Sequence, residues 1–256
     1  MSEADKAVSS QVFYDSLAED FRAQDAFWDN PYDRETWRLK HDLLRPHLTN
    51  SGVLLDIGCG FYPHFEFATA LAVVAGDVSL KSLLVERRFG DESGVVKLCQ
   101  FDPTQLPFTS GSCSAVIAGG ELLNHLEGYE RSLAEIARVL QPDGILMLQV
   151  GAKCCLDSLW ALLDAVTGNW IGYAMTRDEA IAFLRQPCQD SSVTWDITTS
   201  GSLKVRLLSI RHLRRALQDA GFTLLMMYGP TRYPGSSPCR CSRSLRVERF
   251  RSRSPC

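Results

Sequence analysis

Three carboxylates stand where short apolar runs of the sequence end. Asp56, Asp77 and Asp102 occupy these positions, and the first run leads directly into the turn Gly58-Cys59-Gly60. A carboxylate can accept hydrogen bonds from an ammonium group, from ribose hydroxyls or from a purine amine. Glycines allow the main chain to approach a bound molecule closely. These residue types in this order predict a nucleoside-binding site.

Each carboxylate also has a purely structural interpretation. Asp56 could accept hydrogen bonds from its own turn, and Asp77 could cap the helix expected from Ser79. Asp102 could be a turn residue before Pro103. We favour ribose binding for Asp77 and purine binding for Asp102, because the spacing of the turns agrees with a shared ligand.

Short apolar strands alternate with helices through the first two thirds of the sequence. Such alternation predicts βαβ units, a parallel sheet and right-handed crossovers with helices on both faces. Strands are expected at 53–57, 73–75, 95–101, 115–118 and 145–150, and helices at 63–71, 79–89 and 129–140. Every carboxylate above then lies at the carboxyl edge of the sheet, where open α/β sheets bind ligands.

Three further regions flank this core. Residues 1–50 predict a helical leader, with helices near 8–17 and 33–44. Within the main domain, 51–231, the segment 152–208 interrupts the alternation and is interpreted as a cap over the ligand edge. The cap is expected to contain helices at 156–166 and 177–185 and strands at 193–198 and 203–208, and a helix and a strand are expected after it at 210–220 and 222–228.

The last segment, 232–256, differs in composition from the rest. It contains seven arginines and one acidic residue, Glu248, so its formal charge is +7 − 1 = +6. We expect a disordered end, although a basic tail that binds RNA or an acidic partner, or a shifted reading frame, would give the same composition.

Overall composition excludes several classes of protein. The 256 residues suit one large domain, and a net charge of −3 gives no electrostatic case for nucleic acid. None of the nine cysteines forms a C-x-x-C pair, so no metal site is predicted. The polar amino terminus and the lack of an apolar run of ~18 residues predict a cytoplasmic protein without a membrane span.

The first turn also limits the kind of nucleoside. A dinucleotide fingerprint would be G-x-G-x-x-G, but Pro63 stands where the third glycine would be. An acidic residue would also face a pyrophosphate unfavourably. The turn therefore disfavours NAD and favours a cofactor that lacks phosphates and carries a cationic end.

Several stretches together resemble the class I S-adenosylmethionine-dependent methyltransferases, especially the small-molecule type. The similar stretches, in order, are VFYDSLAEDF (12–21), VLLDIGCG (53–60), AGDVS (75–79), QFDPTQLPF (100–108), AVIAGGELLNHL (115–126), LAEIARVLQPDGILMLQV (133–150) and LSIRHLRRALQDAGFTLLMMYG (208–229). The resemblance covers about residues 12–231 and implies a Rossmann-like, doubly wound sheet.

The resemblance also assigns site residues around S-adenosylmethionine. It implies that Asp56, Gly58 and Gly60 line the methionine part of the cofactor and that Asp77 binds the ribose. Phe101 and Asp102 would hold the adenine, and Gly119 would offer main chain near the sulfonium.

Two features depart from the family pattern. Tyr62 stands where the family often has a third glycine. The family sheet has seven strands, but we expect six at most, because the arginine-containing run 245–250 is a poor candidate for the last one. An unpaired edge would then be open to aggregation.

The leading hypothesis is methyl transfer to a small-molecule acceptor. His125 is the first candidate for a general base and Glu121 the second, and Tyr14, Trp28 and Tyr32 could close over the site. The alternatives are an RNA or protein methyltransferase, for which the basic tail is the support, and a non-catalytic relative that keeps only the fold. The acceptor atom and the oligomeric state are not predicted.

Overall fold

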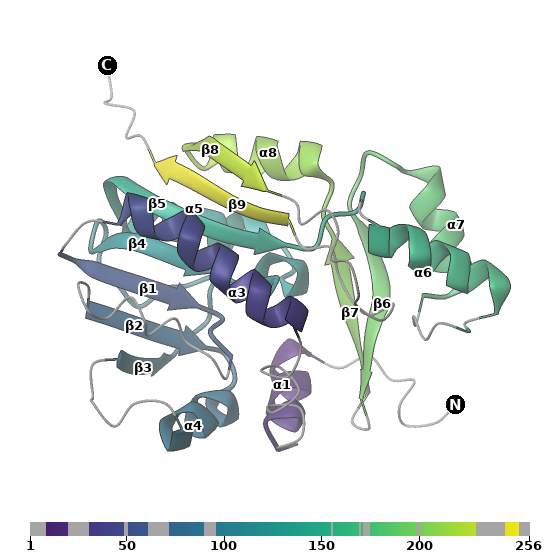
Figure 1. Ribbon diagram of the computed structural model, residues 1–256, viewed down its shortest axis with the longest axis horizontal. Coiled ribbons are helices and arrows are strands. Elements are labelled where there is room, and N and C mark those ends of the chain that lie inside the picture. Colours follow the sequence, from purple (N-terminus) through teal and green to yellow (C-terminus); the bar gives the residue numbers. More distant parts are fainter. Residues whose placement is uncertain are drawn as a thin grey trace.

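The computed structural model describes residues 9–19, 31–48, 51–60, 72–89, 96–154, 156–168, 170, 175–198, 201–228 and 244–250. One seven-stranded sheet has the order β3-β2-β1-β4-β5-β9-β8 (Figure 1). Its strands are β1 (Val53–Ile57), β2 (Ala72–Asp77), β3 (Val96–Gln100), β4 (Cys113–Ala118), β5 (Leu140–Val150), β8 (Phe222–Tyr228) and β9 (Ser244–Phe250).

The five strands β1 to β5 pair in parallel, and β9 runs antiparallel to its neighbours β5 and β8. The predicted α/β fold, a Rossmann-like and mostly parallel doubly wound sheet, is therefore confirmed. Its five parallel strands lie within two residues of their predicted limits, except that β5 begins at Leu140 rather than at Ile145.

Helices cover both faces of the sheet because alternate residues of each strand point to opposite faces. Leu54 packs in a cluster with Leu44 of α3 (Pro31–Leu44), whereas the next residue, Leu55, packs with Leu133 and Ile136 of α5 (Tyr129–Val139). α4 (Leu80–Phe89) joins the α3 face through a cluster that includes Leu83, and α8 (Ile210–Asp219) joins the α5 face.

Strand β9 corrects the expectation that residues 245–250 pair poorly. The strand inserts between β5 and β8, with Ile145 opposite Arg249 and Phe222 opposite Phe250. Main-chain hydrogen bonds to two neighbours stabilise an inserted strand, whatever its side chains, and strand propensity depends strongly on such context. Part of the segment predicted to be a disordered tail thus completes the sheet.

The cap forms a separate layer beside the carboxyl edge of the sheet (Figure 1). It contains α6 (Leu156–Thr167), α7 (Arg177–Arg185) and the hairpin of β6 (Ser191–Thr198) and β7 (Gly201–Leu207). α7 begins with a capping box, in which Thr176 and Glu179 satisfy each other's main-chain N–H groups. These helices and strands follow β5 directly in the sequence, and their role as a cap over a ligand stays a prediction.

The leader contributes α1 (Ser10–Glu19), α3 and the 3-10 turn η2 (Arg45–His47). Phe13 of α1 is buried in the core of the cap, together with Phe183, Val193 and Leu203. The helix predicted at 63–71, Tyr62, and Trp28 lie outside the described residues, as does the side chain of Tyr32. None of the described helices is long and apolar enough to cross a membrane.

Candidate functional site

The turn after β1 has the conformation that its glycines predict. Gly58 and Gly60 both adopt positive φ, at 69° and 58°. The N–H groups of Gly58 and Cys59 donate to the carbonyl of Gly76, at 2.8 and 3.2 Å, which ties the turn to the end of β2. Asp56 is fully buried at the end of β1, directly below this turn.

Asp77 connects the same turn to α4. Its Oδ2 accepts from the N–H of Gly60 at 3.0 Å, and its Oδ1 accepts from the N–H of Ser79 at 2.8 Å. Burial raises the pKa of Asp77, and the hydrogen bonds from Ser79 and Gly60 oppose that increase. Asp77 does not itself cap α4, because the hydroxyl of Ser79 accepts from the N–H of Ser82 at 3.1 Å and so makes Ser79 the cap. Ribose binding remains a prediction for Asp77.

Gly76, the residue before Asp77, lies against Phe101. A Cβ atom on Gly76 would stand 2.0 Å from the ring of Phe101 and 2.6 Å from the carbonyl oxygen of Cys99. Phe101 is nearly buried and contacts Phe108 edge to face, with ring centroids 5.5 Å apart. Only glycine permits this approach, so Gly76 fixes one wall of the predicted adenine loop.

Asp102 is exposed and holds the start of that loop. Its Oδ1 accepts from the N–H and from the hydroxyl of Thr104, both at 2.7 Å. This is the turn contact that aspartate makes with the residue two positions later. Its contact with adenine remains a prediction.

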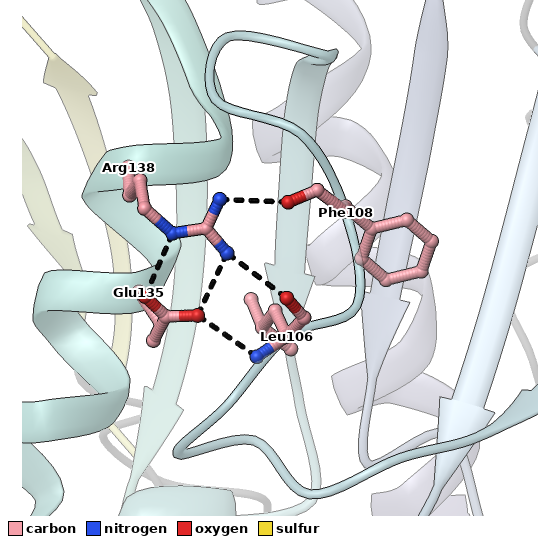
Figure 2. Close-up of polar contacts among 4 residues, drawn as sticks. All are labelled: Leu106, Phe108, Glu135 and Arg138. Carbon is pink, nitrogen blue, oxygen red and sulfur yellow. Dashed lines mark hydrogen bonds and ion pairs between the residues drawn. The ribbon is translucent and has the colours of Figure 1, made fainter.

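An ion pair of α5 holds the middle of the loop (Figure 2). Arg138 donates to the carbonyls of Leu106 and Phe108, at 2.9 and 2.7 Å, and to Glu135 at 2.7 Å. Glu135 also accepts from the N–H of Leu106 at 2.9 Å. The sequence analysis missed this clamp, although an acid and a base three residues apart on a helix were a detectable sign of a pair.

The opposite side of the edge is formed by the segment after β4. Gly119 is buried directly behind that strand, and Glu121 is nearly buried in a left-handed conformation, with φ 60° and ψ 31°. A non-glycine residue in this region is uncommon and is concentrated at functional sites. His125 ends the short helix η4 (Leu122–His125), and its Nε2 lies 3.1 Å from the hydroxyl of Tyr14.

Asn124 anchors this segment and was also missed by the sequence analysis. Its amide nitrogen donates to the carbonyls of Gly151 and Arg206, at 2.8 and 2.6 Å. Its amide oxygen accepts from the N–H of Gly151 at 2.9 Å. One buried side chain therefore ties the end of β4 to the end of β5 and to the cap, through residues far apart in the sequence.

Comparison with known proteins agrees with this geometry. Residues 55–148 match the family model described as a methyltransferase domain. The match covers 94 of the 256 residues, so this part of the chain is similar to a methyltransferase domain. The matched range begins in β1 and ends in β5, so it contains both sides of the edge described above.

Several solved structures share the fold of this chain. An S-adenosylmethionine-dependent methyltransferase from Methanosarcina mazei has a TM-score of 0.61 and 14% identity, covering 82% of this chain and 97% of its own. The [4+2]-cyclase SpnF has a TM-score of 0.64 and 18% identity, with 97% and 99% coverage. A methyltransferase in complex with the Haloferax volcanii Trm112 activator has a TM-score of 0.59 and 17% identity, with 96% and 100% coverage.

The sheet brings most predicted site residues to one edge. Hydrogen bonds join Gly58 and Gly60 to the end of β2 at Gly76 and Asp77, Asp56 lies opposite Ala75 of β2, and Phe101 and Asp102 follow β3. Gly119, Glu121 and His125 follow β4 at the same edge. Within the described residues no group of His, Cys, Asp or Glu is arranged to hold a metal ion.

The turn fits S-adenosylmethionine in one testable respect. Apart from Gly60 and its chain neighbours, no described atom lies within 4 Å of the position that a Cβ atom on Gly60 would occupy, so no described side chain fills this side of the turn. A carboxylate at the end of β2 stands beside that turn. Both observations are compatible with the predicted contacts of the turn to the methionine part and of Asp77 to the ribose.

Proposed function

We propose that the protein transfers the methyl group of S-adenosylmethionine to a small-molecule acceptor. Asp56, Gly58 and Gly60 would hold the methionine part, Asp77 the ribose, and Phe101 and Asp102 the adenine. The cofactor would supply a methyl group bound to a positively charged sulfur. The neutral thioether that remains after transfer is a good leaving group. The position of α1 beside this edge is the observation that carries the proposal of a small acceptor.

Helix α1 contacts three parts of the molecule at once. Asp15 accepts from the hydroxyl of Ser79 at 2.6 Å, Tyr14 contacts His125, and Phe13 enters the core of the cap. A helix held at these three points restricts access from bulk solvent, and exclusion of water favours reaction of an enclosed small molecule. A macromolecular acceptor would need a wider approach.

The residues after β4 would then lie near the acceptor and remove a proton from it. During transfer the bond between sulfur and methyl breaks while a bond between the acceptor atom and methyl forms, and S-adenosylhomocysteine leaves. A hydroxyl or ammonium acceptor must also lose a proton. We propose His125 as the group that takes this proton, with Glu121 as the second candidate.

Binding of S-adenosylhomocysteine to wild-type protein and to Asp77→Asn tests the proposal. The amide keeps the size of the side chain but loses the charge that strengthens hydrogen bonds to ribose hydroxyls. Calorimetry should show a Kd about tenfold higher or more for the variant, since a hydrogen bond to a charged group contributes ~1.5–3 kcal/mol. Asp219→Asn, at an exposed position on α8, is the matched control and should bind like the wild type.

Two outcomes would count against the proposal. If folded wild-type protein does not bind S-adenosylhomocysteine, the cofactor assignment is wrong and a non-catalytic role of the fold becomes the better hypothesis. If Asp77→Asn binds as tightly as the wild type while retaining the wild-type Tm, the proposed ribose contact is wrong.

A further inference from the structure

Helix α1 presents two polar pairs of residues to two different parts of the edge. Ser10 and Tyr14, one turn apart, both contact His125. Asp15 and Glu19, again one turn apart, contact Ser79 and Lys81 at the start of α4. Because a helix is rigid over this length, the two contact points cannot move independently.

His125 is held by α1 at its main chain and at its ring. The hydroxyl of Ser10 donates to the carbonyl of His125 at 3.2 Å. The hydroxyl of Tyr14 lies 3.1 Å from Nε2, and the two rings are nearly perpendicular, at 89°, with centroids 5.7 Å apart. A hydrogen bond to one ring nitrogen fixes both the orientation of an imidazole and the nitrogen that carries its proton.

Asp15 of α1 is linked through Ser79 and Asp77 to the turn that is proposed to bind the cofactor. Asp15 accepts from the hydroxyl of Ser79 at 2.6 Å, and the N–H of Ser79 donates to Asp77 at 2.8 Å. Asp77 in turn accepts from the N–H of Gly60. Ser79 is fully buried, so water does not compete readily for these contacts.

We propose that Tyr14 is a positioning residue for His125 and that Asp15, through Ser79, makes this positioning depend on the cofactor-binding turn. The inference rests on the proposed function, because it assigns a partner to the proposed base. A ligand that engages Asp77 changes its hydrogen bonds to Ser79. The change alters how α1 is held and reaches the imidazole through Tyr14.

Nitrogen-15 NMR of labelled histidine tests the positioning of His125 in the free protein. The chain has five histidines, and loss of a signal in His125→Gln identifies the relevant one. Tyr14→Phe removes only the hydroxyl and should shift the ring nitrogens of His125 while the other histidines stay in place. Val12→Ala, at an exposed position of α1, is the control and should leave the signal unchanged. An unchanged His125 signal in Tyr14→Phe would overturn the positioning role.

Titration with S-adenosylhomocysteine tests the dependence on the turn. Wild-type protein should show a shift of the His125 signal on binding. Asp15→Asn, measured at saturation, should lose most of that shift, and reversion to Asp should restore it. A full shift in saturated Asp15→Asn would overturn the link through Ser79.

The two proposals fail in different ways. Lack of S-adenosylhomocysteine binding by wild-type protein would refute the cofactor and, with it, the dependence on the turn, whereas the effect of Tyr14→Phe on the free protein would still establish the positioning contact. If S-adenosylhomocysteine binds but the NMR signal of His125 does not shift, the cofactor assignment stands and the proposed link between the turn and His125 is refuted.

Discussion

The carboxyl edge of the sheet and the cap are stabilised in different ways. At the edge, main-chain groups of neighbouring turns bond to one another, as Gly58 does to Gly76, and side chains cap nearby main chain. In the cap, a buried ammonium makes the central polar contacts. Lys153 donates to the carbonyls of Gln186 and Gln189 and to Ser191, at 2.6, 3.0 and 2.6 Å, and lies over the ring of Phe183.

The outer surfaces of the two regions differ as well. Exposed positions of α5 include Glu130 and Arg131, as expected for a helix that packs on a sheet. The outer face of α6 is instead apolar. Its exposed residues include Leu159, Trp160, Leu163 and Val166, and Trp170 follows with 87% of its surface exposed. The comparison teaches that main-chain contacts between strand ends stabilise the edge at β1 and β2, whereas the polar contacts inside the cap depend largely on the side chain of Lys153.

The largest loss of stability is expected from a substitution at Gly76, where the main chain lies against the ring of Phe101. Gly76→Ala should lower the free energy of unfolding by about 3 kcal/mol, because the added methyl overlaps the ring of Phe101 and overpacking of this kind costs about 1–3 kcal/mol or more. Gly111→Ala is the matched control, since its position has positive φ but open space and should cost ~1–2 kcal/mol. Chemical denaturation measures both, and equal losses would argue against the overlap.

A somewhat smaller loss of stability, confined to the cap, is expected from a substitution at Lys153. Lys153→Met keeps the length of the side chain but leaves buried acceptors without their donor, at a cost of about 2 kcal/mol. Hydrogen exchange should accelerate in α7 and β6 and stay slow in β1 and β4. Lys204→Met, at an exposed position of β7, is the control. Uniform acceleration across the sheet would show that the cap and the sheet unfold as one unit.

The smallest effect is expected on the affinity for S-adenosylhomocysteine, when the ion pair of Glu135 and Arg138 that holds the loop 102–108 is broken. Glu135→Gln should raise the Kd for S-adenosylhomocysteine about three- to tenfold, because a partly exposed ion pair that orders a loop contributes roughly 1 kcal/mol. Glu130→Gln, on the exposed face of α5, should bind normally. A wild-type Kd in Glu135→Gln would show that the loop is ordered without the clamp.

The stability that the ion pair of Glu135 and Arg138 contributes should depend on pH. Arg138 lowers the pKa of Glu135, so the folded state holds this carboxylate ionised more strongly than the unfolded state does. Its contribution is present above the unfolded pKa of about 4.3 and is lost as the pH falls through the lowered folded value. The stability difference between wild type and Glu135→Gln should therefore shrink in acid, and denaturation at several pH values measures it.

The sequence alone predicted the elements whose residues are close together in the chain. The helix over 177–185 and the strand over 222–228 appear with the predicted limits, because apolar spacing and flanking turn residues determine such elements locally. Asp56, Asp77 and Asp102 were placed at the correct edge for the same reason, since the order of strands along a parallel sheet brings their carboxyl ends together.

Tertiary structure decided the contacts that join distant segments. Strand β9 forms although its arginine-containing sequence resembles no buried strand, because β5 and β8 both offer it main-chain partners. The hydrogen bonds of Asn124 to Gly151 and Arg206, and the contact between Tyr14 and His125, likewise span long stretches of chain. Periodicity and turn residues carry no information about such pairs. Only the folded chain brings them within hydrogen-bond distance.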